Sequence, residues 1–161
     1  MKIKIFITGG TIDNLEYDDP KHAPNNQESL IPGLFKQSRI TVPYDIEEIM
    51  FKDSKFVDDK DRELIAEKCK QCFEDKIIIT HGTATMPLTA KYLDGKKINK
   101  TIVLLGAAFP ANQQSSDALF NIGAAFSAVQ FLAPGVYIVM NGQIFNANNV
   151  KKEKSYFHNE H

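Results

Sequence analysis

Apolar residues in this chain gather in short, nearly continuous runs, and longer stretches of mixed polarity separate them. Most of these runs are apolar throughout, as in Ile77-Ile78-Ile79. Continuous runs, rather than alternating ones, are typical of parallel strands that are covered on both faces of a sheet. The pattern predicts strands at 3–8, 45–51, 76–80, 101–105 and 135–140.

Three longer stretches, at 58–75, 86–94 and 116–132, are expected to be helices. In the first, apolar residues recur with a period near that of a helix, and Asp58 and Asp59 suit its N-terminus. Strands that alternate with helices, joined by right-handed crossovers, predict an α/β fold. We therefore expect a doubly wound, mainly parallel sheet of about five strands with helices on both faces.

One domain accounts for most of the chain. Residues 13–34 are rich in Asp, Asn, Pro and Gly, which predicts a long loop, and loops of this length are usually functional. We expect residues 1–150 to form the domain and residues 151–161 to be a polar, frayed tail.

Composition narrows the classes of function. The chain has 161 residues, 43% of them hydrophobic, and a net charge of -1, which fits a globular domain and gives no case for binding nucleic acid or a membrane surface. The N-terminus lacks the pattern of a signal peptide, so we expect a cytoplasmic protein with reduced thiols. Cys69 and Cys72 fall within the helix expected at 58–75, which favours packing over metal binding.

Glycines and hydroxyl residues follow several of the predicted strands. Ligands of open α/β sheets bind outside the carboxyl ends of the strands, so these residues predict a site for a small polar molecule. A nucleotide-binding module is a further alternative for this class of sheet, but the glycines match neither the dinucleotide fingerprint nor a phosphate-binding loop. The segments concerned are Thr8-Gly9-Gly10-Thr11-Ile12, Lys52-Asp53-Ser54, His81-Gly82-Thr83-Ala84-Thr85-Met86 and Gly106-Ala107.

Two of these segments resemble the signatures of the bacterial-type L-asparaginases. Thr8-Gly9-Gly10-Thr11-Ile12 is similar to the first signature, and His81-Gly82-Thr83-Ala84-Thr85-Met86 is similar to the second, which normally reads H-G-T-D-T-M. The chain resembles a short, single-domain branch of that family. The resemblance implies hydrolysis of L-asparagine to L-aspartate and ammonia through a threonine nucleophile, with no metal and no organic cofactor.

The resemblance also implies roles for individual residues. Thr11 is the nucleophile by position, Thr83 is the second catalytic threonine, and Tyr17 is the tyrosine that assists Thr11. Main-chain amides near Gly10 and Thr83 are expected to stabilise the oxyanion. The substrate-binding residues implied are Gly10, Asp53, Ser54, Gly82, Thr83 and Ala84.

The sequence departs from the family pattern at two places. Ala84 stands where the second signature has an aspartate, and the helix expected to carry the catalytic lysine lies in a segment, 115–137, that contains none. Asp13 and Asp117 are candidates to replace the carboxylate, and His81 is expected to make a structural hydrogen bond. These departures leave two hypotheses: a slow asparaginase-like amidohydrolase, and a pseudoenzyme that binds a small amino acid or carboxylate.

The expected partner is a small-molecule substrate such as asparagine. A homo-oligomer is possible, through an edge of the sheet or through the helix expected at 116–132.

Overall fold

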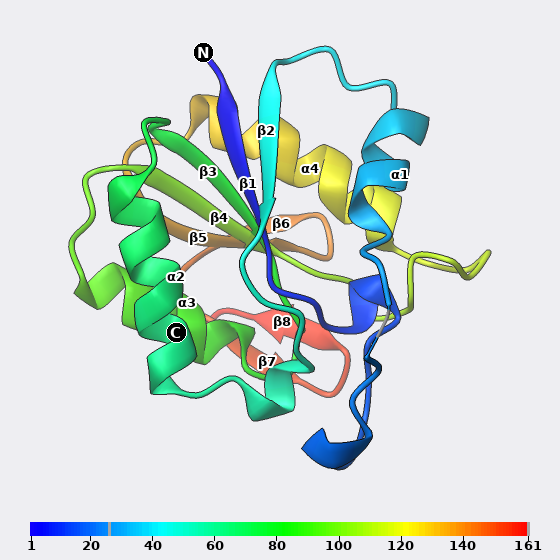
Figure 1. The fold of residues 1–161 in the computed structure, drawn as a ribbon. Helices are drawn as coiled ribbons and strands as arrows, with labels where there is room; N and C mark the ends of the chain where they lie inside the picture. Colours follow the sequence, from blue (N-terminus) through cyan, green and yellow to red (C-terminus); the bar gives the residue numbers. More distant parts are fainter. Residues whose placement is uncertain (26, 161) are drawn as a thin grey trace.

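The computed structural model describes residues 1–25 and 27–160 and has an α/β architecture (Figure 1). A six-stranded sheet is built from β1 (Ile3–Ile7), β2 (Tyr44–Glu48), β3 (Lys76–Thr80), β4 (Thr101–Leu105), β5 (Gly135–Met140) and β6 (Gln143–Asn146). Four α-helices join or flank them: α1 (Ile31–Gln37), α2 (Asp59–Gln71), α3 (Met86–Gly95) and α4 (Ala118–Phe131).

The strand order is β2-β1-β3-β4-β5-β6, and β1 to β5 are all parallel. β6 adds an antiparallel edge strand through a tight turn after β5. The doubly wound, mainly parallel sheet expected from the sequence is confirmed. Three strands, β3, β4 and β5, have the predicted bounds, because a run of buried apolar residues between turn residues leaves little choice of register.

Two apolar cores lie on opposite faces of the sheet. Alternate strand residues, such as Ile5 and Phe6, point to opposite faces and join different cores. Helices α2 and α3 cover one face, and α1 and α4 cover the other (Figure 1).

Helix α1 was not expected, because its sequence lies partly in the loop predicted at 13–34. Gly33 lowers the helical propensity of this seven-residue segment, whereas Pro32 lies in the first turn, where proline is tolerated. The start of α1 is held by tertiary contacts: the buried carboxylate of Asp13 accepts hydrogen bonds from Leu30 N at 2.7 Å and Ser29 Oγ at 2.8 Å. Ile31, Leu34 and Phe35 then bury one face of α1 against the sheet and α4.

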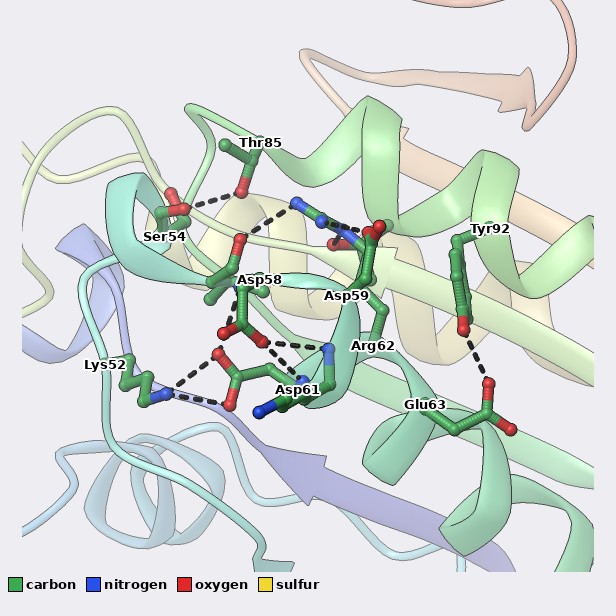
Figure 2. Close-up of polar contacts among 12 residues, drawn as sticks. Lys52, Ser54, Asp58, Asp59, Asp61, Arg62, Glu63, Thr85 and Tyr92 are labelled. Atoms are coloured by element: carbon green, nitrogen blue, oxygen red, sulfur yellow. Dashed lines mark hydrogen bonds and ion pairs between the residues drawn. The ribbon is translucent and has the colours of Figure 1, made fainter.

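The N-terminus of α2 is fixed to the loop that precedes it, as Asp58 predicted. The Asp58 side chain accepts hydrogen bonds from Lys60 N and Asp61 N, and the Asp61 side chain accepts one from Asp58 N at 3.0 Å. Lys52 Nζ forms an ion pair with Asp61 at 2.7 Å (Figure 2). This reciprocal cap holds the segment between Lys52 and Asp58 against the helix.

The C-terminal segment is folded as far as residue 160, which corrects the expectation of a frayed tail at 151–161; residue 161 lies outside the described residues. A hairpin of β7 (Lys151–Glu153) and β8 (Tyr156–His158) turns back onto the α3 side of the sheet. Phe157 is buried there against Phe145, and its backbone N donates to Asn141 Oδ1 at 3.0 Å. The segment looks polar because Phe157 is its one core residue among charged neighbours, so the sequence carried little signal.

We expect the hairpin to contribute to the stability of the whole domain. Phe157→Ala should lower the free energy of unfolding by about 3–5 kcal/mol, the usual cost of removing a buried phenylalanine side chain. Tyr156→Ala is the matched control, because the neighbouring Tyr156 ring is mostly exposed. Urea denaturation of both variants tests this, and equal midpoints for the two would show that the hairpin is not part of the core.

Candidate active site

The loops after β1, β2 and β3 come together at the point where the strand order reverses. The chain leaves β1 toward β2 on one side, whereas β3 leads to β4 and β5 on the other side. Such a switch point opens a crevice at the carboxyl ends of the strands, where ligands of these folds bind. Both candidate signatures therefore lie at one end of the sheet.

Gly10 and Gly82 bring the two signature loops into direct backbone contact. A Cβ atom on Gly10 would lie 2.3 Å from Gly82 Cα, and Gly10 has a φ of +88°, which favours glycine. Gly9 approaches the loop after β2 in the same way, since its Cβ would lie 2.7 Å from Lys52 N. No larger residue fits at either position without moving a backbone.

Ser54 joins this contact from the loop after β2. A Cβ on Gly82 would lie 2.5 Å from Ser54 Oγ, so the serine side chain packs directly on the glycine. Thr85 Oγ1 donates to Ser54 O at 2.7 Å and ties the two loops together (Figure 2). Three of the expected substrate-binding residues, Gly10, Ser54 and Gly82, are thus brought together.

The hydroxyl of Thr11 contacts a carboxylate that no motif in the sequence indicates. Thr11 is half-buried beside Gly10, and its Oγ1 donates to Glu16 Oε1 at 2.7 Å. Glu16 is exposed and follows the short helical turn Thr11–Asp13. The pair depends on the path of that turn, and no sequence spacing indicates it.

Tyr17 and Asp53 are bound to each other rather than to Thr11. The Asp53 backbone N donates to Tyr17 Oη at 3.3 Å, and Tyr17 N donates to Asp53 Oδ2 at 3.2 Å. The Tyr17 ring stacks on Phe56 with centroids 5.1 Å apart. In this structure both residues anchor the loop after β1 to the loop after β2.

Thr83 and Ala84 occupy the turn that follows Gly82. Thr83 is buried, and its Cγ2 lies 3.2 Å from the position of a Cβ on Gly106, so this threonine packs against the loop after β4. Ala84 is exposed and supplies no charge at the aspartate position of the second signature.

Asp13 and Asp117, the candidates to replace the carboxylate missing at Ala84, bind groups outside the two signature loops. Asp13 holds the start of α1, and burial raises the pKa of its carboxyl. Asp117 accepts hydrogen bonds from Ala108 N at 2.9 Å and Phe109 N at 3.2 Å, which shape the loop after β4.

His81 anchors the second signature from inside the protein. Its ring is fully buried, with Nδ1 2.7 Å from Gly82 O and Nε2 3.0 Å from Thr89 Oγ1. A carbonyl oxygen only accepts, so Nδ1 carries the hydrogen and Nε2 accepts from Thr89. Arg62 Nε in turn donates to Thr89 Oγ1 at 3.3 Å. The chain of contacts from α2 through α3 to the histidine fixes the Gly82 peptide.

Burial lowers the pKa of His81 from 6.5 to about 4, which agrees with a neutral ring. The structural hydrogen bond expected for His81 is present.

The Cys69 thiol packs in the core beneath α2, and burial raises its pKa. Among residues 1–25 and 27–160, no group of three or more His, Cys, Asp or Glu side chains is placed to hold a metal ion.

Comparison with known proteins identifies the family. The protein-family model described as "Asparaginase, N-terminal" matches residues 2–159. The chain belongs to the asparaginase family. This confirms the resemblance drawn from the two signature segments, and the family model extends across the C-terminal hairpin.

The asparaginase relatives are longer than this chain. It is 27% identical over 161 residues to an L-asparaginase of Thermococcus kodakarensis, covering 96% of this chain and 48% of the relative. It is 33% identical over 148 residues to one of the subunits of the glutamyl-tRNA(Gln) amidotransferase of the same organism, covering 88% of this chain and 33% of the relative. The chain thus spans half or less of these relatives.

A solved asparaginase structure shares the fold. The crystal structure of a probable cytoplasmic L-asparaginase from Campylobacter jejuni superposes with a TM-score of 0.83 at 31% identity, covering 98% of this chain and 52% of that one.

In the part of our chain that the structure describes, no helix has the length and apolar character needed to cross a bilayer.

The buried histidine makes stability depend on pH. Because the folded state binds the His81 proton only near pH 4, whereas the unfolded state binds it near 6.5, the free energy of unfolding should fall as the pH drops from 6.5 toward 4. The loss should reach about 3 kcal/mol. In His81→Gln this pH dependence should be largely gone, and in His158→Gln, which changes an exposed tail histidine, it should persist. Urea titrations at several pH values measure it, and equal slopes for wild type and His81→Gln would contradict the assignment.

Proposed function

We propose that this chain is an asparaginase-like amidohydrolase that uses Thr11 as its nucleophile and Glu16 as its general base. The observation that carries the proposal is the 2.7 Å hydrogen bond from Thr11 Oγ1 to Glu16 Oε1, beside the contact of the two signature loops. A threonine hydroxyl is a weak nucleophile unless a neighbour takes its proton, and Glu16 is placed to do so. The proposed substrate is L-asparagine, which is hydrolysed to L-aspartate and ammonia.

In the first step, Thr11 Oγ forms a bond to the carbon of the side-chain amide while its proton moves to Glu16. The tetrahedral oxyanion then collapses, the carbon–nitrogen bond breaks, and Glu16 returns the proton to the leaving nitrogen, which departs as ammonia. An ester between Thr11 and the aspartyl group remains. Backbone N–H groups near Gly10 and Thr83 are proposed to stabilise the oxyanion, since fixed donors at a developing charge lower the barrier.

In the second step, Glu16 takes a proton from a water molecule, which attacks the ester carbon. Collapse of the second oxyanion breaks the bond to Thr11, and Glu16 returns the proton to Thr11 Oγ. Thr11 and Glu16 regain their starting states, and aspartate is released.

Ser54, Gly82 and Gly10 are proposed to bind the substrate. Their mutual contact supports this, because it brings a hydroxyl and backbone amides together at the carboxyl ends of the strands. Asp53 and Tyr17, which brace the loop beneath, are proposed to position Ser54 and Thr11.

The pairing of Thr11 with Glu16 predicts a specific loss of activity. Thr11→Val should abolish ammonia release from L-asparagine, and Glu16→Gln should lower kcat by about 10²–10⁴, the usual contribution of a positioned proton-transfer group. Asp18→Asn is the control, since it neutralises an exposed carboxylate of the same loop that contacts Lys55 instead of Thr11. Coupled ammonia assays at high enzyme concentration compare the wild type with the three variants.

Undiminished activity in Thr11→Val would overturn the nucleophile, and undiminished activity in Glu16→Gln would overturn only the base. If the wild-type chain releases no ammonia at any concentration, the amidohydrolase proposal fails.

The second candidate function is a pseudoenzyme that binds a small amino acid or carboxylate without turnover. Ala84 favours it, because the second signature lacks the carboxylate that the family resemblance assigns to proton handling and to the substrate ammonium. α4 also carries no lysine, and the lysines that follow it in the sequence, from Lys151 onward, belong to the C-terminal hairpin instead.

Restoring the aspartate discriminates between the two functions. For an active enzyme, Ala84→Asp should tighten asparagine binding by about 1.5–3 kcal/mol, the value of a hydrogen bond to a charged group, and lower KM accordingly. Ala84→Asn, of the same shape without the charge, is the control. Calorimetric binding of aspartate by the wild type with no ammonia release from wild type or Ala84→Asp would favour the pseudoenzyme.

A further inference from the structure

The outer face of α4 has no charged residue. Its sequence from Ala118 to Phe131 is uncharged throughout, although one face of the helix is exposed. Phe120 is 63% exposed and Phe131 is 90% exposed. A helix at a free surface normally presents charged and polar residues to water, so this face has the character of a covered surface.

The apolar surface continues from α4 onto the edge of the sheet. Ala124, Ala128 and Phe131 line a groove of about 390 Å³ together with Ile144 of β6. Ile144 is half exposed, and in the described residues β6 pairs with β5 alone, which leaves the other edge of β6 open. In Figure 1, α4 lies on the face of the sheet opposite α2 and α3, with its long side free of other helices except α1 at one end.

Six exposed or half-buried residues along α4 are spaced symmetrically. Successive separations are three, one, three, one and three positions, so the series reads the same from either end. A two-fold axis perpendicular to the helix, between positions 125 and 126, would place each member opposite its symmetry mate on an antiparallel copy. Leu119 and Gln130 also reach the surface but stand outside this series. The series is Phe120, Gly123, Ala124, Ser127, Ala128 and Phe131.

We propose that α4 is the interface of a homodimer, in which it packs antiparallel against α4 of a second copy. The small residues Gly123, Ala124 and Ser127 at the centre would let the two helix axes approach to about 8 Å. Phe120 of one copy would lie beside Phe131 of the other at each end. A surface that fits itself about a two-fold axis is what an isologous dimer requires.

The exposed area supports a second copy as the occupant. Covering Phe120 and Phe131 at their present exposure would remove roughly 300 Å² from water, given the about 200 Å² that a phenylalanine presents. That is more than a third of the about 800 Å² that each partner buries in a standard interface, and the groove along Ile144 extends it. No charge on α4 has to lose its water, so burial carries no desolvation penalty from ions.

Sedimentation velocity of the purified chain tests the interface. The wild type should sediment as a dimer at micromolar concentrations, and Phe131→Glu should sediment as a monomer because it places two charges in the apolar contact. Leu88→Glu is the matched control: Leu88 is 59% exposed and lies on α3, which covers the opposite face of the sheet, so its variant should remain a dimer.

A monomeric wild type over the whole concentration range would overturn the proposal, as would a dimer that survives Phe131→Glu. Dimerisation lost equally in Leu88→Glu would place the contact elsewhere. Circular dichroism of each variant shows whether it is folded.

Disulfide trapping tests the antiparallel arrangement without disturbing the phenylalanines. In a Cys72→Ser background, Ser127→Cys lies next to the proposed axis and should form an intermolecular disulfide on mild oxidation. Ala133→Cys, which is exposed just beyond α4, should not link to itself, because antiparallel packing puts its two copies at opposite ends. Self-linking at 133 without linking at 127 would overturn the arrangement.

Discussion

The contact between Gly10 and Gly82 is the constraint on which the candidate site depends. Two loops from neighbouring parallel strands touch through their backbones, and a Cβ on Gly10 would lie 2.3 Å from Gly82 Cα. Since the strands are adjacent, their carboxyl ends are already close. The absence of a side chain on each glycine lets the two loop backbones come into contact. Thr11 follows one glycine directly and Thr83 follows the other, so this single contact sets the separation of the two hydroxyls.

The site combines a rigidly held backbone segment at Gly82 with a more accessible pair of side chains, Thr11 and Glu16. Gly82 is held from below by neutral His81, which Thr89 and Arg62 fix in turn. Thr11 and Glu16 lie further out, where Glu16 is exposed to water. This division fits the proposed hydrolysis, because peptides that stabilise an oxyanion need fixed positions, whereas a general base has to reach both the nucleophile and the incoming water.

Continuous apolar runs in the sequence predicted the central sheet, and tertiary contacts decided the rest. The apolar runs at β3, β4 and β5 gave correct bounds because burial on both faces allows one register. Helix α1 was missed because Asp13, seventeen residues before Leu30, holds its start. The hairpin at β7 and β8 was missed because one buried ring, Phe157, carries its packing. In the candidate site, the structure brings together Gly10, Ser54 and Gly82, which the motifs named, whereas the Thr11–Glu16 pair arises from a loop path that no local pattern encodes.

Of the described carboxylates near the two signature loops, Glu16 is the one in contact with a signature hydroxyl, which favours it as the proton acceptor. The second signature loop has Ala84 in place of a carboxylate. The Asp13 carboxylate binds the start of α1, and the Asp117 carboxylate binds the loop after β4. Thr83 is buried next to Gly106 and has no carboxylate beside it in its own signature. Glu16 is by contrast in direct hydrogen-bond contact with a signature hydroxyl. The carboxylate proposed as the general base therefore lies in the first signature loop, and for the second loop the proposal needs only its shape and its backbone donors.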